Sequence, residues 1–424
     1  MINTKSTRII IPAHRHIKLI FIVVTGLFPL AAQAAATLLD AFTYGKFSGQ
    51  LRYRYEMVDQ ENFAKNANAS TLRTQLGYTT DSYQGFTAFL QLENVFVIGN
   101  ELYNSTANGR TQYPMVADPD GTELNQAWLS YETPYSTTLK YGRQVINLDN
   151  QRFIGNVGWR QNEQTFDAFS LVNTSLTDTT LFYAHVDNVN RIFGENHPNP
   201  LLADSRMSSE LINVGYKGLK AGNLTAYAYL LDYDKTPPVS HKDLGLRFDG
   251  SYKLKGNKKL LYTAEYARQS PYADGADTNK ADYGLAALGI DISGVQLKLN
   301  YELLTGDGVY AFQTPLATLH AFNGWADQFL STPKDGLQDI FVTIGKTVMG
   351  VNLAAVYHDY ASDNLSYNYG TEWNFLATKK IDKNLSLTLK YAAYNGAKNT
   401  LNTARNIALT RDTDKLWLQA DFQF

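Results

Sequence analysis

Residues 295–302, Val-Gln-Leu-Lys-Leu-Asn-Tyr-Glu, alternate between apolar and polar side chains. The same period of two recurs in Leu51–Glu56 and in residues 385–391. Successive side chains of a β-strand point to opposite faces, so this pattern predicts strands with one apolar and one polar face. No stretch of comparable length has a convincing helical period, and the sequence therefore predicts an all-β fold.

About eighteen segments of this kind follow one another between Tyr44 and Phe424, each about ten residues or more, the length that a tilted membrane-crossing strand requires. We expect strands near 44–57, 70–80, 84–97, 123–133, 135–145, 163–173, 176–188, 208–218, 221–233, 241–254, 258–269, 279–292, 294–304, 335–347, 350–360, 366–380, 384–394 and 409–424. This succession predicts a transmembrane antiparallel β-barrel of about 18 strands.

The connections between these segments alternate in length. Short ones such as 255–257 and 382–383 alternate with long ones such as 98–122, 146–162 and 305–334. Outer-membrane barrels have short periplasmic turns and longer outer loops. A soluble β-sandwich also alternates apolar and polar faces, but it would not need so regular a change of loop length. The prolines after residue 34 avoid every proposed strand, as expected because proline cannot donate to a β ladder.

The first 34 residues have the features of a cleavable Sec signal peptide. A basic leader precedes an apolar run over 19–30, and Ala32-Gln33-Ala34 fits the usual cleavage pattern. The run is too short for a membrane-spanning helix, although an uncleaved anchor is the alternative. The chain is therefore predicted to consist of a signal peptide, 1–34, and a single barrel domain, 35–424, exported to the outer membrane of a Gram-negative cell.

Composition disfavours several other classes. With 38 Lys+Arg against 40 Asp+Glu, the chain lacks the basic excess of a nucleic-acid binder, and without cysteine it has no thiol chemistry. No common hydrolase, phosphate-binding or dinucleotide motif follows the signal, and the histidines are scattered. We expect no enzyme, no cofactor and no metal site, although a triad assembled from separate strands would escape sequence analysis.

Polar residues opposite the apolar face are predicted to point into the lumen. These include Lys217, Arg247 and Lys298 in the middle of the chain. In the first third, basic groups concentrate with a few carboxylates, and the pore-lining candidates are Arg52, Arg54, Arg73, Lys140, Arg143, Arg152, Arg160, Glu93 and Asp167. Rings of Arg or Lys line anion-selective pores, so this cluster predicts a basic path. The competing interpretation is that each charge belongs to a cross-strand pair that braces the wall.

Two stretches carry a family resemblance. Residues 141–144 and 150–168 closely resemble the alginate export porin family of Gram-negative outer membranes, and residues 312–316, 322–329, 332–333 and 336–337 resemble its porin-like members. The resemblance implies an eighteen-stranded monomeric barrel whose arginine-rich lumen and long loops control passage of an acidic polysaccharide. It makes Arg143, Arg152 and Arg160 the leading pore-lining candidates, with Asp167 as their partner.

The segment 305–334 is too long for a simple turn. It carries Trp325, Asp327 and His320, which are candidates for a constriction if the segment folds into the lumen. The same residues would serve equally well in a packed external lid, and the sequence leaves both arrangements open.

The sequence thus favours an outer-membrane channel for passive passage of small anionic solutes or acidic saccharides. The alternatives are a general diffusion porin with weak selectivity and a barrel whose long loops serve adhesion or reception. The expected partners are membrane lipid and lipopolysaccharide, an anionic saccharide or small anionic solute, and a periplasmic partner that the sequence does not identify. Nucleic acid is not expected.

Overall fold

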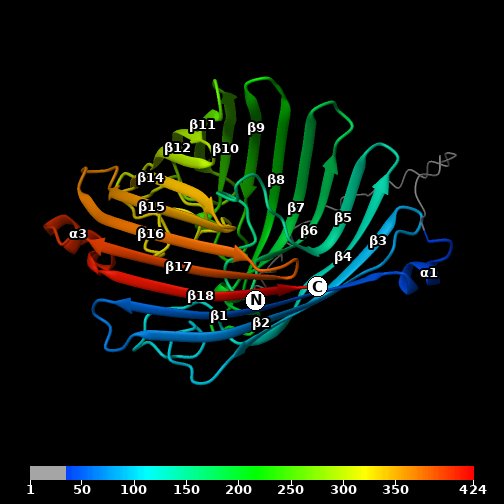
Figure 1. Cartoon of the computed structure of the whole chain (residues 1–424), viewed down its shortest axis with the longest axis horizontal. Helices are drawn as coiled ribbons and strands as arrows, with labels where there is room; N and C mark the ends of the chain where they lie inside the picture. The colour runs from blue at the N-terminus through cyan, green and yellow to red at the C-terminus, as the bar shows by residue number, and fades with distance from the viewer. Residues whose placement is uncertain (1–34) are drawn as a thin grey trace, which may run out of the picture. The chain divides into compact units, whose positions relative to one another are not determined.

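The computed structural model describes residues 35–424, and the predicted signal peptide lies outside the described residues. Eighteen strands form one antiparallel sheet in which chain neighbours pair, and β1 pairs with β18 to close a barrel (Figure 1). The strands are β1 (Lys46–Gln60), β2 (Ala67–Thr79), β3 (Phe86–Val97), β4 (Gly121–Thr133), β5 (Thr137–Gln144), β6 (Thr165–Asn173), β7 (Thr179–Asn190), β8 (Asp204–Leu219), β9 (Gly222–Leu231), β10 (His241–Lys253), β11 (Lys258–Pro271), β12 (Ala281–Ile292), β13 (Val295–Leu304), β14 (Leu337–Val348), β15 (Val351–Ala361), β16 (Asn368–Lys380), β17 (Leu385–Gly396) and β18 (Thr413–Gln423). The predicted fold class is confirmed.

Every predicted segment corresponds to one of these strands, and the ends differ by a few residues. The largest differences are at β8, which begins at Asp204 rather than 208, and at β18, which begins at Thr413 rather than 409. The short helices, all outside the sheet, are α1 (Leu38–Thr43), α2 (Pro200–Ala203), α3 (Thr400–Arg405), η1 (Pro237–Val239) and η2 (Ile407–Thr410). Within residues 35–424, no helix has the length and apolar character needed to cross a membrane.

One rim of the barrel consists of tight turns. Ser293-Gly294 joins β12 to β13 and Met349-Gly350 joins β14 to β15, with φ angles of 52° and 83° in the first turn and 50° and 74° in the second. Two-residue hairpins of type I′ require positive φ at both central positions, which explains the glycines. In outer-membrane barrels the short-turn rim faces the periplasm and the long loops face outward.

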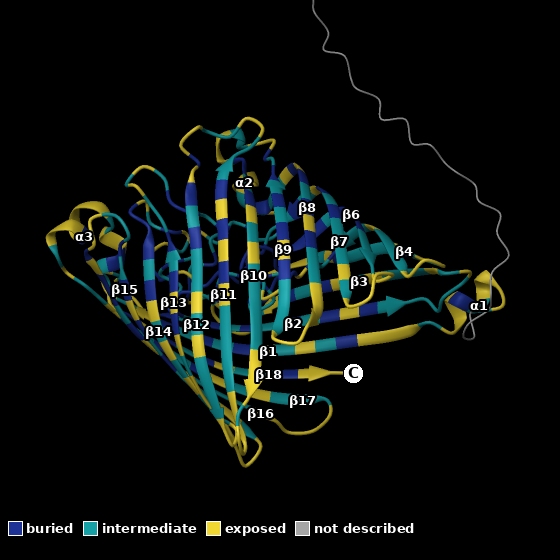
Figure 2. Ribbon diagram, turned by 90° about the horizontal axis from the view of Figure 1, so that it is seen from above, coloured by how far each residue is buried: buried dark blue, intermediate teal, exposed yellow. Residues whose placement is uncertain are grey.

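The two faces of the wall differ as the alternation predicts. Along β13, Leu297, Leu299 and Tyr301 are exposed on the outer face, whereas Asn300 and Glu302 are buried in the lumen. Figure 2 shows this alternation as bands of buried and exposed residues along the strands. Such a closed barrel satisfies its own backbone hydrogen bonds, which is the condition for strands to cross hydrocarbon.

Long loops fold into the barrel and pack against its inner wall. Loops 145–164 and 305–336 join each other there, because Gly155 N donates to Leu316 O (2.9 Å) and Thr318 N donates to Gln151 O (3.0 Å). Phe153 of the first loop packs among aromatic rings, two of which are Tyr227 of β9 and Phe312 of the second loop. Segment 305–334 therefore lies inside the barrel and is not an external lid.

Candidate functional site

Arg152 ties both inward loops to the barrel wall. Its Nε lies 2.8 Å from Glu302 Oε1 on β13, and its Nη1 and Nη2 donate to Thr314 Oγ1 (3.2 Å) and Asn323 Oδ1 (3.0 Å) of loop 305–336. Its ring neighbour is Phe322, whose centroid is 4.8 Å from the guanidinium carbon. A buried arginine is tolerated only with such pairing, so Arg152 holds the two loops against β13.

Arg160 has the same role on the other side of the lumen. Its Nη1 is 3.0 Å from Glu56 Oε2 on β1, and its Nη2 is 3.0 Å from Asp327 Oδ2 in loop 305–336. Asp118 Oδ2 of loop 98–120 lies 3.6 Å from Arg160 Nη1. Arg160 thus joins both other inward loops and β1 at one buried point. The partners of Arg152 and Arg160 differ from the predicted Asp167, because the loops bring in carboxylates that are distant in sequence.

The arginines of β1 and β2 are also paired. Arg54 is fully buried, and its guanidinium carbon lies 4.2 Å from the ring centroid of Trp159 in loop 145–164. Its Nη2 also donates a hydrogen bond to the Trp159 carbonyl. Arg73 Nη1 lies 3.0 Å from Glu163 of the same loop and 3.8 Å from Glu93 of β3, another of the pore-lining candidates. Arg52, whose Nε is 2.8 Å from Asp421 of β18, donates to the Gly158 carbonyl. These arginines hold residues 158–163 of loop 145–164 against β1 and β2.

Arg143 and Asp167 do form the predicted pair, with Nε to Oδ1 at 2.8 Å. Along β5, Lys140 and Gln144 are an even number of positions apart, so their side chains share one face, and both line a lumenal pocket. Arg143 is an odd number of positions from each of them and lies on the opposite face. It therefore shares the register of the outward-facing Tyr141, near the end of the strand. Lys140 lies in the lumen with its ammonium 4.4 Å from the ring centroid of Trp128.

The predicted constriction residues form one buried cluster. His320 Nδ1 is 2.6 Å from Asp327 Oδ1, and His320 Nε2 is 2.7 Å from Lys390 Nζ on β17. Because an ammonium can only donate, Nε2 accepts from Lys390, and the proton on Nδ1 is donated to Asp327. The Lys390 ammonium sits 4.2 Å from the ring of Trp159 and 3.8 Å from that of Trp325.

Electrostatics in this cluster agree with the hydrogen bonds. Burial lowers the pKa of His320 well below its usual value, although the Asp327 carboxylate opposes that shift. Burial favours the neutral acid at Asp327, yet His320 and the neighbouring Lys415 and Arg160 together lower the pKa of Asp327 well below its usual value. The cluster therefore holds a neutral imidazole and an ionised carboxylate, and it fastens loop 305–336 to β17 and β18.

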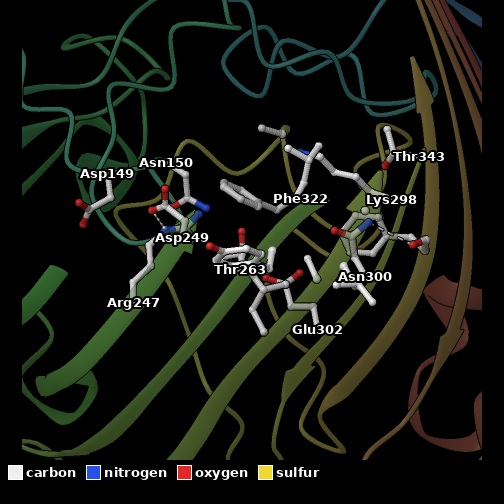
Figure 3. Close-up of a pocket in the computed structure, with 18 of the residues that line it drawn as sticks. Asp149, Asn150, Arg247, Asp249, Thr263, Lys298, Asn300, Glu302, Phe322 and Thr343 are labelled. Atoms are coloured by element: carbon white, nitrogen blue, oxygen red, sulfur yellow. Dashed lines mark hydrogen bonds and ion pairs between the residues drawn. The ribbon is translucent and has the colours of Figure 1, made fainter. Parts of the chain in front are cut away.

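Beneath the inward loops, towards the short turns, lies a cavity of about 750 Å³ on the wall formed by β8 to β15. Figure 3 shows Arg247 and Asp249 on one side, Lys298 and Thr343 on the other, and Phe322 above the middle. Trp325 of the same loop as Phe322 also lines the cavity.

The cations of this cavity are less constrained than the arginines. Within the described part of the chain, neither Lys217 nor Lys298 has a carboxylate oxygen within 4.0 Å of its ammonium. Arg247 is paired with Glu265 (2.7 Å) and lies 3.5 Å from Asp249. The alternation of β8, β10 and β13 predicted that these cations face the lumen, but they are far apart in sequence and do not form a cluster that sequence inspection would select. Residues 35–424 contain no group of three potential His, Cys, Asp or Glu ligands placed to hold a metal ion.

The closed barrel and its loop-filled, charged lumen define the class of protein as an outer-membrane channel of the porin type. A family model described as "Alginate export" matches residues 43–303, more than half of the chain. The chain therefore belongs to the alginate export family, and the resemblance seen in the sequence is confirmed. No curated protein matches the sequence.

Solved structures share the fold at low sequence identity. OccAB2 of Acinetobacter baumannii is 16% identical, with a TM-score of 0.71 over 91% of this chain and 99% of that chain. OccD3 (OpdP) of Pseudomonas aeruginosa is 15% identical, with a TM-score of 0.67 over 92% and 94%. OpdK of Pseudomonas aeruginosa, solved with vanillate, is 11% identical, with a TM-score of 0.65 over 89% and 98%. The monomeric state, the solute and any periplasmic partner of this chain stay predictions.

Proposed function

We propose that this channel passes small anionic solutes, including acidic saccharides, and that the cations of the cavity on β8 to β15 attract them. The observation that carries the proposal is that Lys217 and Lys298 line this cavity without a carboxylate partner among residues 35–424. An unpaired ammonium in a confined space attracts anions more strongly than an ion pair does, because the field of a pair largely cancels. The cavity of about 750 Å³ has room for a small solute.

The predicted basic path over Arg52, Arg54, Arg73, Arg152 and Arg160 is a weaker basis for anion selectivity. These side chains are buried or nearly buried, and each has an acidic partner within 4.0 Å. Their contribution to solute attraction is reduced because carboxylates neutralise them. Loops 145–164 and 305–336 also favour transport over adhesion, because they bind each other and the inner wall through Arg152 and Arg160.

A general diffusion porin is the second candidate, and the mixed charge of the cavity favours it. Asp149, Asp249 and Glu302 line the same space as the cations. If these carboxylates balance Lys217 and Lys298, the channel is only weakly selective.

Reversal potential in a planar bilayer separates the two functions. We expect the wild type to prefer anions under a salt gradient, and the double variant Lys217→Gln/Lys298→Gln to lose most of that preference. Lys242→Gln, on the outer face of β10, removes the same kind of charge outside the lumen and should leave the reversal potential unchanged. A wild type that prefers cations would contradict the proposal, and weak selectivity unaffected by the double variant would favour the diffusion porin.

Solute size and charge can be tested with liposomes. Swelling should be faster with glucuronate than with glucose, which has a similar ring but no carboxylate, and the double variant should remove the difference. Arg152→Ala is a poor choice for this test, because it disturbs the loops as well as the charge.

A further inference from the structure

A groove of about 450 Å³ lies on the outer face of the barrel over β14 to β18. It exists because Ala355 and Ala377 are diagonal neighbours on the outward registers of β15 and β16, where most other strand positions carry large side chains. Ala355 lies opposite Phe375, and Ala377 lies opposite Leu389 on the other side. Two short side chains among bulky neighbours leave a hollow in the apolar outer face.

The groove is almost wholly apolar, and Lys346 is the one charged residue that lines it in the described chain. Lys346 lies opposite Leu353, close to the tight turn at Met349-Gly350. Its ammonium has no carboxylate within 4.0 Å among residues 35–424, and the exposed Lys379 follows on the outward register of β16 towards the same rim.

A lysine on the lipid-facing surface is least costly near the interface, where its long stem lies along apolar surface while its ammonium reaches the headgroup layer. Lys346 meets this condition by its position, because it lines the groove and lies three positions before the tight turn at Met349. The groove is apolar and ends at an unpaired cation. It is therefore complementary to a lipid in which an acyl chain is followed by an anionic phosphate.

We propose that this groove binds a glycerophospholipid of the membrane leaflet at the short-turn rim, with one acyl chain over Ala355 and Ala377 and the phosphate at Lys346. The acyl chain fills the hollow that the alanines leave, and the Lys346 ammonium donates a hydrogen bond to a phosphate oxygen. The site lies outside the lumen, so it is independent of the solute that the channel passes.

The test is native mass spectrometry of the full barrel, extracted in mild detergent and titrated with phosphatidylglycerol or diacylglycerol. We expect the wild type to hold one phosphatidylglycerol and to bind diacylglycerol at least 5-fold more weakly. Ala355→Phe, which fills the groove, should lower the occupancy of both lipids at least 5-fold. Lys346→Gln should remove only the preference for phosphatidylglycerol.

Matched controls keep the test specific. Ala264→Phe adds the same ring to the outward face of β11, and Lys258→Gln removes an outward lysine from the same strand, so both should bind lipid like the wild type. Heat-modifiable migration in gels and unchanged conductance verify that each variant is folded, and Ala377→Leu replaces Ala355→Phe should the latter not fold. Three outcomes would overturn the proposal. The Ala355→Phe and Ala264→Phe proteins could bind lipid equally, or the wild type could bind the two lipids with equal affinity. The wild type could also retain lipid A or a second barrel in place of phospholipid.

Discussion

Two walls of the lumen carry cations in different ways. On β1 and β2, Arg54 and Arg73 are 0% and 1% exposed and contact loop 145–164, which closes over them. On β8 and β13, Lys217 is exposed and Lys298 is half-buried, and both border an open cavity. The alternation of the strands places all four residues inside the barrel, so inward orientation alone does not determine what a lumenal charge does.

The difference follows from desolvation. A guanidinium withdrawn from water is stable only when carboxylates and carbonyls replace the lost hydration, and the loops supply those groups. Once paired, the charge contributes to loop position more than to the field in the pore. A lysine that keeps its water needs no such partner and remains free to attract a passing anion.

The largest expected effect comes from breaking the paired wall at Arg160. Arg160→Met leaves the buried carboxylates of Glu56 and Asp327 without their shared cation, which we expect to destabilise the barrel by about 3–5 kcal/mol. Because the same arginine joins the inward loops, single-channel conductance should also rise or become noisy. Thermal unfolding and bilayer recordings measure the two effects.

Arg143→Met is the matched control for this prediction. Arg143 and Asp167 form an ion pair of similar geometry but are 23% and 33% exposed, so the loss should be about 0–1 kcal/mol with unchanged conductance. Equal destabilisation by the two variants would show that burial of the pair is not what distinguishes them.

Lys390 gives the next largest effect. Lys390→Met removes the cation between Trp159 and Trp325 and the donor to His320, at an expected cost of about 1–3 kcal/mol. Loosening of loop 305–336 should make tryptophan fluorescence more accessible to iodide. Lys140→Met, which removes a cation from the ring of Trp128 without breaking such a network, should change quenching less. Unchanged quenching and stability in Lys390→Met would contradict an anchoring role.

The strands of this barrel are predictable from sequence because their signal is local. Alternation, strand length and loop length can each be seen within short stretches of sequence. Together they predicted eighteen strands whose ends agree with those of the structure within a few residues. The pattern is weakest where the lumen is not aqueous. On β9, Tyr227 and Tyr229 point inwards although they are aromatic, because Phe153 of loop 145–164 packs against them.

The ion pairs of the loops are not predictable in this way. Arg152 and Glu302 are 150 positions apart, and Arg160 and Glu56 are 104 positions apart. Their pairing depends on the path of each loop through the lumen, which tertiary packing decides. A basic cluster in the sequence therefore indicates where cations gather, but it does not show whether each remains available to solutes.

A pair of variants sharpens the comparison of the two walls. Lys298→Gln should shift the reversal potential towards zero and change the free energy of unfolding by less than about 0.5 kcal/mol, because the side chain is half-buried and unpaired. Arg54→Gln should instead lower the free energy of unfolding and leave the reversal potential nearly unchanged. Arg54 is fully buried, and its loss affects Trp159 and Asp118. If Arg54→Gln instead changes selectivity at constant stability, the paired arginines take part in conduction.

The smallest expected effect concerns the outer end of loop 305–336, where Asp335 accepts a hydrogen bond from Arg405 Nη2 of α3 (2.6 Å). Burial favours the neutral acid, but hydrogen bonds from Arg405, with Tyr367 and Asn364 assisting, lower the pKa of Asp335 to about 2. A carboxyl whose pKa is lowered in the folded state stabilises that state above its ordinary pKa, near 3.8, and this contribution is lost as the pH falls towards 2. Acidifying only the long-loop side from pH 7 to pH 2.5 should therefore increase current noise mainly below pH 4. Arg405→Gln lacks the guanidinium, so it should be noisier already at pH 7 and change less on acidification, whereas an identical acid response in both proteins would assign the effect to other carboxylates.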